Sequence, residues 1–145
     1  MNVSFRSNDW KERILSNFAA TPFTITINGE AFQCQSVEGF WQGLKSKDER
    51  RQYVFGLFGL AAKNAGRGKK SASFEIAGVT YRVGSKEHEA LIREAIKQKI
   101  LQNPKAAEAL NTSTGTITHQ VPGSTKPIFK MEKMLMSVRN ELYGH

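Results

Sequence analysis

The sequence is poor in cysteine and has no long apolar run. Cys34 is the single cysteine of the chain, which excludes an internal disulfide and favours a reducing compartment. No apolar stretch approaches the roughly 20 residues that a membrane-spanning helix requires. Residues 1–18 also lack the continuous apolar core of a signal peptide. We therefore expect a cytoplasmic protein that has no membrane partner.

Acidic residues are also scarce, with 13 Asp and Glu against 21 Lys and Arg, and the formal net charge is +8. Such an excess attracts polyanions through its long-range field, which favours a phosphate-bearing partner, either a nucleotide or a nucleic acid. The alternative is that the charge only aids solubility, because no run of Lys and Arg is as dense as a nucleic-acid-binding tail.

Two common site types are missing from the sequence. The spacing Gly-x-x-x-x-Gly-Lys-Ser/Thr of a phosphate-binding P-loop does not occur. Three scattered histidines and one cysteine do not form the ligand set of a zinc site, so we expect no zinc. Cys34 itself is predicted to be a buried residue on a strand rather than a nucleophile.

The patterning of the 145 residues predicts one α+β domain over 1–145, rich in helices and with small β-hairpins. A first hairpin is expected over 22–34, because Asn28 and Gly29 accept the positive φ angles of a type I′ turn. A second hairpin is expected over 73–84, turning near Ala77 and Gly78. Residues 112–121 read as a loop that leads into a short strand.

Helical spacing and capping residues predict the rest of the fold. Ser36 is a plausible N-cap for a helix that runs to residue 45, and Ser85 for the strongest helix of the chain. Gly56 and Gly59 weaken the helical pattern of the second segment unless they allow close backbone packing. The further helices are expected over 47–64, 86–103, 104–110 and 128–143.

The helix that follows Ser36 carries a polar line along one side. Glu38, Gln42 and Lys45 occupy positions i, i+4 and i+7, which stack on one face of a helix. The neighbouring stripe is apolar and can face a core; it consists of Val37, Phe40, Trp41 and Leu44. The polar line is therefore either a solvated face or one wall of a cleft.

Five stretches together resemble the NADAR (YbiA-like) family, in the same order and spacing over residues 15 to 142. They are "LSNFAATPF" (15–23), "SVEGFWQGLK" (36–45), "AGRG" (65–68), "LIREAIKQKILQNPKAAEALNTST" (91–114) and "MLMSVRNEL" (134–142). Three places depart from the family pattern. Gly39 stands where the family has His, Gly84 where it often has Trp, and "VPGSTKPIFK" (121–130) replaces a Trp-Gly…Asn-x-Leu-Gly segment.

The resemblance implies a small, mostly helical α+β domain that cleaves N-glycosidic bonds to ribose without a metal or an organic cofactor. Members of the family remove ADP-ribose from guanine in nucleic acid or hydrolyse phosphoribosylated riboflavin intermediates. The implied partner is thus an ADP-ribosyl or ribosyl-phosphate substrate, including ADP-ribosylated nucleic acid. The alternative is a non-catalytic basic module that binds a nucleotide or nucleic acid on the same fold.

On this resemblance we assign catalysis to Glu38, Lys45 and His119. Positive charge develops on the anomeric carbon as the bond breaks, so a carboxylate such as Glu38 stabilises the transition state or activates water. Lys45 either holds a phosphate or attacks an opened ribose as an amine, forming a Schiff base. His119 would share proton transfer with Glu38. The structural alternatives are a Glu favoured by the helix dipole, a solvated Lys and a structural His.

Substrate binding is assigned to Asn17, Phe18, Gln42, Gly66, Arg67 and Lys126. Asn17 and Phe18 would serve the base, through an amide for its polar edge and a ring for stacking. Gln42 would orient a ribose hydroxyl. Gly66 and Arg67 open a glycine-basic loop suited to phosphate oxygens, although a solvated turn explains it equally well.

Overall fold

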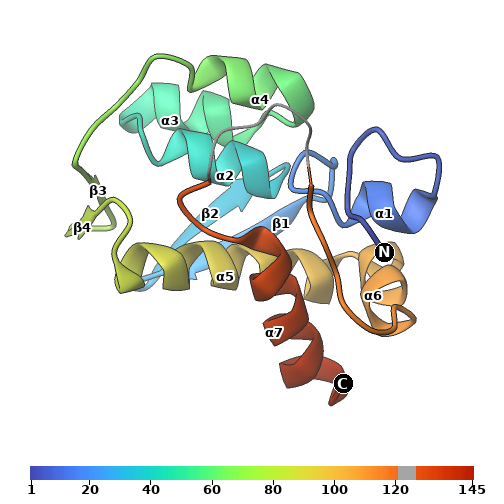
Figure 1. Cartoon of the computed structure of the whole chain (residues 1–145). Coiled ribbons are helices and arrows are strands. Elements are labelled where there is room, and N and C mark those ends of the chain that lie inside the picture. The colour runs from blue at the N-terminus through green and yellow to red at the C-terminus, as the bar shows by residue number, and fades with distance from the viewer. Residues whose placement is uncertain (121–126) are drawn as a thin grey trace.

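The computed structural model describes residues 1–120 and 127–145 (Figure 1). Its helices and strands follow in the order α1 (Trp10–Ile14), β1 (Phe23–Ile27), β2 (Glu30–Cys34), α2 (Val37–Gly43), α3 (Asp48–Phe55), α4 (Gly59–Ala65), β3 (Ser73–Ile76), β4 (Val79–Arg82), α5 (Lys86–Gln102), α6 (Pro104–Asn111) and α7 (Met131–Tyr143). The predicted fold class, a helix-rich α+β protein with small hairpins, is confirmed.

Both hairpins form where turn chemistry predicted them. Asn28 and Gly29 have φ angles of 48° and 81°, which suit a type I′ turn, and Ala77 and Gly78 repeat the pattern at 51° and 78°. In the first hairpin Phe23 pairs with Cys34, and alternate residues of β1 are buried. Each hairpin forms its own two-stranded antiparallel sheet.

Three local predictions were wrong, and one helix was not predicted. The helix expected over 47–64 is two helices, because α3 ends before Gly56, and Gly59, at φ +60°, departs from helical backbone where α4 begins. The strand expected after residue 112 is a single bridge between Asn2 and Thr118. The last helix begins at Met131 instead of 128. The short helix α1, capped by the side chain of Asp9, was not predicted.

The long helix α5 crosses the middle of the molecule (Figure 1). Helices α2, α3 and α4 lie above it in this view, α7 crosses it and extends below, and α6 follows at its right-hand end. The first hairpin packs against α5 through β1, and α2 contacts α3, α4 and α5. Helix α2 is therefore packed between α5 on one side and α3 and α4 on the other. The surroundings of Glu38 and Gln42 depend on these three helices.

Close packing of α2 on α3 explains one departure from the family pattern. A β-carbon at Gly39 would lie 2.6 Å from the backbone oxygen of Leu57, and one at Gly43 would lie 2.3 Å from the ring of Phe55. No side chain fits at either position without moving α3, so a His cannot stand at residue 39 of this chain. Close backbone packing was considered for Gly56 and Gly59. The structure shows it at Gly39 and Gly43 instead.

Candidate active site

Helix α2 is anchored so that Glu38 lies in its first turn. Ser36, which is fully buried, accepts a hydrogen bond from the Gly39 N–H at 2.8 Å and donates one to the carbonyl of Leu57 at 2.8 Å. The predicted N-cap is confirmed. The backbone N–H of Glu38 donates to the carbonyl of Asn17 at 2.9 Å, which joins the first turn of α2 to the loop before β1.

Glu38 and Gln42 are in direct contact. Gln42 donates a 2.8 Å hydrogen bond from Nε2 to Glu38 Oε1. The Gln42 side chain is buried, and its Oε1 has no hydrogen-bond partner among the described residues. A buried amide oxygen without a partner is costly, so it is a natural acceptor for a bound hydroxyl or N–H group.

Gly66 completes this contact from the end of α4. A β-carbon at residue 66 would lie 1.7 Å from Gln42 Oε1 and 2.5 Å from its Cδ. The φ angle of Gly66 is −93°, a value open to any residue, so the glycine is needed for space rather than for backbone conformation. The structure therefore brings together three of the predicted site residues, Glu38, Gln42 and Gly66.

Burial and charge set the proton affinities of the polar line. Burial raises the pKa of Glu38 above its ordinary value, while the Gln42 hydrogen bond and the charges of Lys45 and Lys63 oppose that rise. Burial lowers the pKa of Lys45, and the Glu38 carboxylate opposes that shift. The carboxylate and the amine thus act on each other's charge. Among the described residues they form no ion pair.

The loop that carries Asn17 and Phe18 is held by three successive carbonyl groups. Ser16 accepts from Lys99 Nζ at 2.8 Å, Asn17 from the Glu38 N–H at 2.9 Å, and Phe18 from the Gly59 N–H at 2.9 Å. The donors belong to α5, α2 and the start of α4. Because its backbone is fixed on three sides, this loop presents the half-buried side chains of Asn17 and Phe18 in a set position beside Glu38.

Lys99 was missed as a site residue. Its side chain is 1% exposed, and burial lowers its pKa to about 7. A signal for this was present in the sequence, because Lys99 follows Ala95 and Ile96 at helical spacing and so falls on the apolar face of α5. Its amine supports the Asn17 loop from beneath.

An aromatic pair adjoins this loop. The rings of Phe18 and Phe5 lie 5.9 Å apart between centroids. Phe5 is 41% exposed, and Phe58, which precedes Gly59, is 48% exposed. Exposed rings of this kind are surfaces on which a nucleobase can stack.

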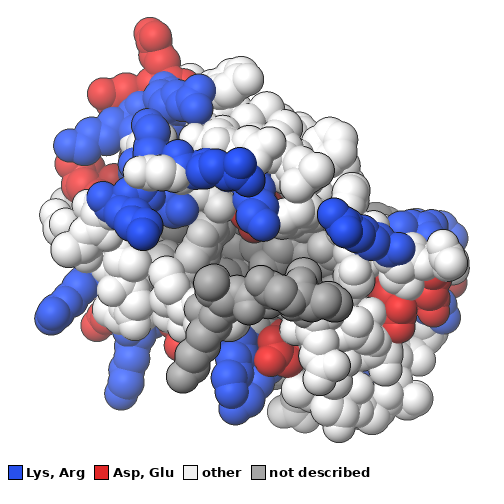
Figure 2. Space-filling model, turned by 45° about the horizontal axis from the view of Figure 1, so that its top comes forward, with Lys and Arg blue, Asp and Glu red and all other residues white. Residues whose placement is uncertain are grey.

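The opposite end of the polar line is basic. Lys and Arg side chains gather over α3 and α4 and reach the edge of a hollow in this face of the molecule (Figure 2). Arg67 is exposed, and Lys69 Nζ lies 3.4 Å from Ser46 Oγ just beyond α2. Arg50 donates to the carbonyl of Ala65 at 3.3 Å. Of these cations, Lys69 contacts Ser46, the residue after Lys45. Helix α2 ends at Gly43 rather than at the predicted residue 45, so Lys45 lies just beyond the helix.

One assigned residue, His119, does not join the Glu38 group. His119 Nδ1 donates to the carbonyl of Val3 at 2.8 Å, and no described contact links it to Glu38. Lys126 lies outside the described residues. Cys34 is 2% exposed, and burial raises the pKa of its thiol to about 12, in agreement with its predicted place in the core.

Within residues 1–120 and 127–145, no three His, Cys, Asp or Glu side chains are grouped to hold a metal ion. None of the helices described is both long enough and apolar enough to cross a bilayer.

Comparisons with known proteins agree with this fold. Residues 9–136 match the model of a family described as bacteriophage protein GP30.3. The chain is 35% identical over 121 residues to an uncharacterized 17.1 kDa protein from the Gp30–rIII intergenic region of Enterobacteria phage T4, covering 79% of this chain and 77% of that one. The NMR structure of Escherichia coli YbiA superposes with a TM-score of 0.64 at 18% identity, over 98% of this chain and 86% of YbiA.

Proposed function

The chain belongs to the bacteriophage protein GP30.3 family, and from its site and its YbiA-like fold we propose that it is an N-glycosidase. Its substrate would be a base or amine joined to a ribosyl-phosphate or ADP-ribosyl group, for example ADP-ribose on guanine in nucleic acid. The NADAR resemblance suggests the reaction class, and the proposal assigns that reaction to Glu38, Gln42 and Lys45 of this chain.

The observation that carries the proposal is the half-buried Glu38 side chain, whose carboxylate accepts a hydrogen bond from the buried Gln42 and lies near enough to the exposed Lys45 for their charges to interact. A carboxyl whose pKa is raised by burial holds a proton more readily than an exposed one, so it can both accept a proton and return it. An amine whose pKa is lowered has more of its nucleophilic free-base form. A solvated helix face would not bury the Gln42 side chain or leave its amide oxygen without a partner among the described residues.

In direct hydrolysis, Glu38 takes a proton from a water molecule as the water oxygen bonds to the anomeric carbon. The bond from that carbon to the base nitrogen breaks, and its electron pair leaves with the base. Glu38 then returns the proton to the base nitrogen, so the products are the free base and ribose with a new hydroxyl group. The carboxylate also stabilises positive charge on the sugar in the transition state.

In the covalent alternative, the Lys45 amine takes the place of water. It bonds to the anomeric carbon as the base leaves, the ring opens to an imine, and water then hydrolyses the imine and frees the amine. Gln42 Oε1 would accept from a ribose hydroxyl in either route. Phe18 would stack on the base, and Arg67 with Lys69 would contact phosphate oxygens.

The test is release of free ADP-ribose from an oligonucleotide with ADP-ribosylated guanine, followed by mass spectrometry, with the phosphoribosylated riboflavin intermediate assayed in parallel. We expect turnover by the wild type on one of the two substrates, and none by Glu38→Gln. If the wild type binds the adducts and cleaves neither, the protein is a basic binding module, a reading that its charge of +8 also supports.

A further inference from the structure

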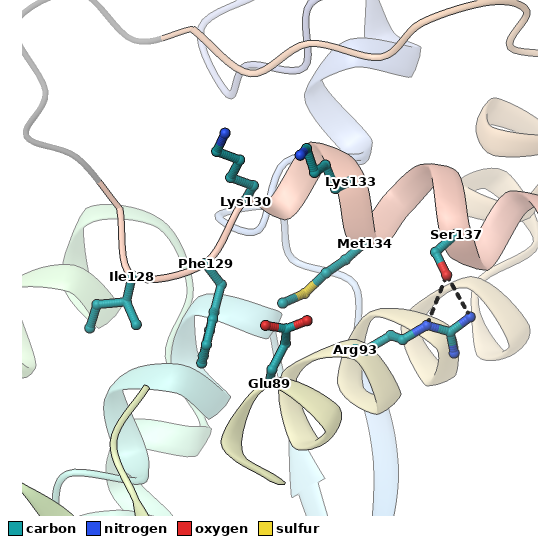
Figure 3. A pocket seen from close by; sticks show the side chains of 8 residues that line it. All are labelled: Glu89, Arg93, Ile128, Phe129, Lys130, Lys133, Met134 and Ser137. Atoms are coloured by element: carbon teal, nitrogen blue, oxygen red, sulfur yellow. Dashed lines mark hydrogen bonds between the residues drawn. The ribbon is translucent and has the colours of Figure 1, made fainter. Parts of the chain in front are cut away.

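A pocket lies away from the Glu38 group, between α5, α7 and the segment that enters α7 (Figure 3). Its volume is about 330 Å³, within the range of roughly 300 to 1,000 Å³ typical of small-molecule sites. Helix α5 contributes Glu89 and Arg93, the entering segment Phe129 and Lys130, and α7 Lys133 and Met134. None of these residues has a part in the proposed hydrolysis.

The rim of the pocket carries two available cations. Lys130 and Lys133 are exposed, and neither side chain forms a hydrogen bond or an ion pair within the described residues. Their amines point to the rim and away from Glu89 (Figure 3). Arg93, in contrast, is engaged, because it donates to Ser137 Oγ at 3.2 and 3.0 Å and pairs with Glu141 at 3.1 Å.

The interior offers a flat ring and one acceptor. The Phe129 ring, the Met134 side chain and the Glu89 carboxylate extend into the same space (Figure 3). Phe129 is held in place edge-to-face by Trp41, with centroids 5.7 Å apart, and by His88, with centroids 5.0 Å apart. A carboxylate only accepts hydrogen bonds, so Glu89 suits a ligand group that presents an N–H donor.

We propose that this pocket binds one nucleotide of a single-stranded nucleic acid. The base lies between Phe129 and Met134 with its amino group on Glu89, and the flanking phosphates meet Lys130 and Lys133 at the rim. Stacking of a base on an aromatic ring favours binding and tolerates any base. The acceptor adds a preference for bases with an exocyclic amino group, as in cytosine, over thymine.

Phe129 joins this pocket to α2, because its ring meets Trp41, which lies next to Gln42 in the chain. The inference extends the proposed function toward nucleic-acid substrates, but binding here requires neither an adduct nor turnover.

The experiment measures fluorescence anisotropy with labelled, unmodified oligo(dC) and oligo(dT) over a range of salt concentrations. We expect the wild type to bind oligo(dC) more tightly. Lys130→Gln/Lys133→Gln should weaken both by about 10-fold and reduce the salt slope by about 1.4, the value for two contacts to a single strand. The matched control is Lys11→Gln/Lys105→Gln, which removes the same charge beside Trp10 on α1 and α6. It should change either affinity less than about 3-fold.

Glu89→Ala tests the base contact and should bring the oligo(dC) to oligo(dT) affinity ratio close to one. The proposal is overturned if the wild type binds both oligonucleotides equally, if the two double variants weaken binding alike, or if an acidic peptide of equal charge competes as well as DNA. Glu38→Gln should bind the unmodified oligonucleotides like the wild type. If hydrolysis is absent while this binding persists, only the proposed N-glycosidase function fails.

Discussion

Gly66 lies against the amide of Gln42 so closely that a β-carbon in its place would come within 1.7 Å of Gln42 Oε1. The same amide donates to Glu38, so the turn after α4 determines the position of the carboxylate through one intervening side chain. The geometry of the candidate site therefore depends on a residue that carries no functional group.

Gly66→Ala should separate activity from stability. The added methyl group displaces the flexible end of Gln42 rather than backbone, so we expect the free energy of unfolding to fall by less than about 2 kcal/mol. Activity on the adduct should fall by about 100-fold, because Glu38 loses its oriented partner. Chemical denaturation and adduct release measure the two effects. Gly56→Ala is the matched control, since its β-carbon would lie at an ordinary 3.4 Å from its nearest neighbour.

Glu38→Gln should remove turnover while making the fold more stable at neutral pH. The variant keeps an acceptor for Gln42 but cannot exchange a proton, so we expect activity to fall at least about 100-fold. Burial raises the pKa of Glu38, so the folded state retains its proton at pH values where the unfolded chain has lost it. Wild-type stability from this group is thus complete below the ordinary pKa of 4.5 and falls as pH rises above it. Denaturation curves from pH 4 to 8 would contradict this if the variant lost stability over that range as steeply as the wild type.

Lys45→Arg distinguishes the two roles of the amine. Arginine keeps the positive charge and can bind phosphate, but its guanidinium does not form an imine at neutral pH. We expect the variant to bind the adduct and to lose turnover, and borohydride to trap a ribosyl adduct on wild-type Lys45 alone. Retained turnover by the arginine variant would instead assign Lys45 to phosphate binding.

Lys99 should make stability rise with pH above neutrality. Burial lowers its pKa from 10.5 to about 7, so between these values the folded protein releases a proton that the unfolded chain still binds. Stability from this group therefore increases with pH across that window, by up to about 1.4 kcal/mol per unit, and is constant below it. The free energy of unfolding of Lys99→Met should not rise with pH over this window, whether the variant is more or less stable than the wild type. Equal pH slopes for the two proteins from pH 7 to 10 would show that the amine is not buried in this way.

Gly39→Ala should destabilise the fold by about 1 to 3 kcal/mol, because its β-carbon would lie 2.6 Å from a backbone oxygen that cannot rotate aside. A histidine at the same position should be worse, although it restores the NADAR pattern. Thermal unfolding, again with Gly56→Ala for comparison, measures the difference. A stable, active Gly39→His variant would contradict the close packing of α2 on α3.

Sequence rules succeeded where the deciding interactions are local. The Asn28–Gly29 turn, the Ser36 and Ser85 caps and the period of α5 depend on residues within a few positions of one another. The alignment of Glu38 with Gln42 follows from helical geometry in the same way. These features determine the fold class and place a carboxylate and an amide on one line of α2.

The tertiary structure decided whether that line is a site. Gly66 reaches Gln42 from 24 positions along the chain, and the amine of Lys99 reaches the carbonyl of Ser16 across 83. The hydrogen bond from His119 to Val3 likewise depends on a contact that no local pattern encodes. The partial burial that raises the pKa of Glu38 and lowers the pKa of Lys45 likewise exists only once distant segments pack around α2.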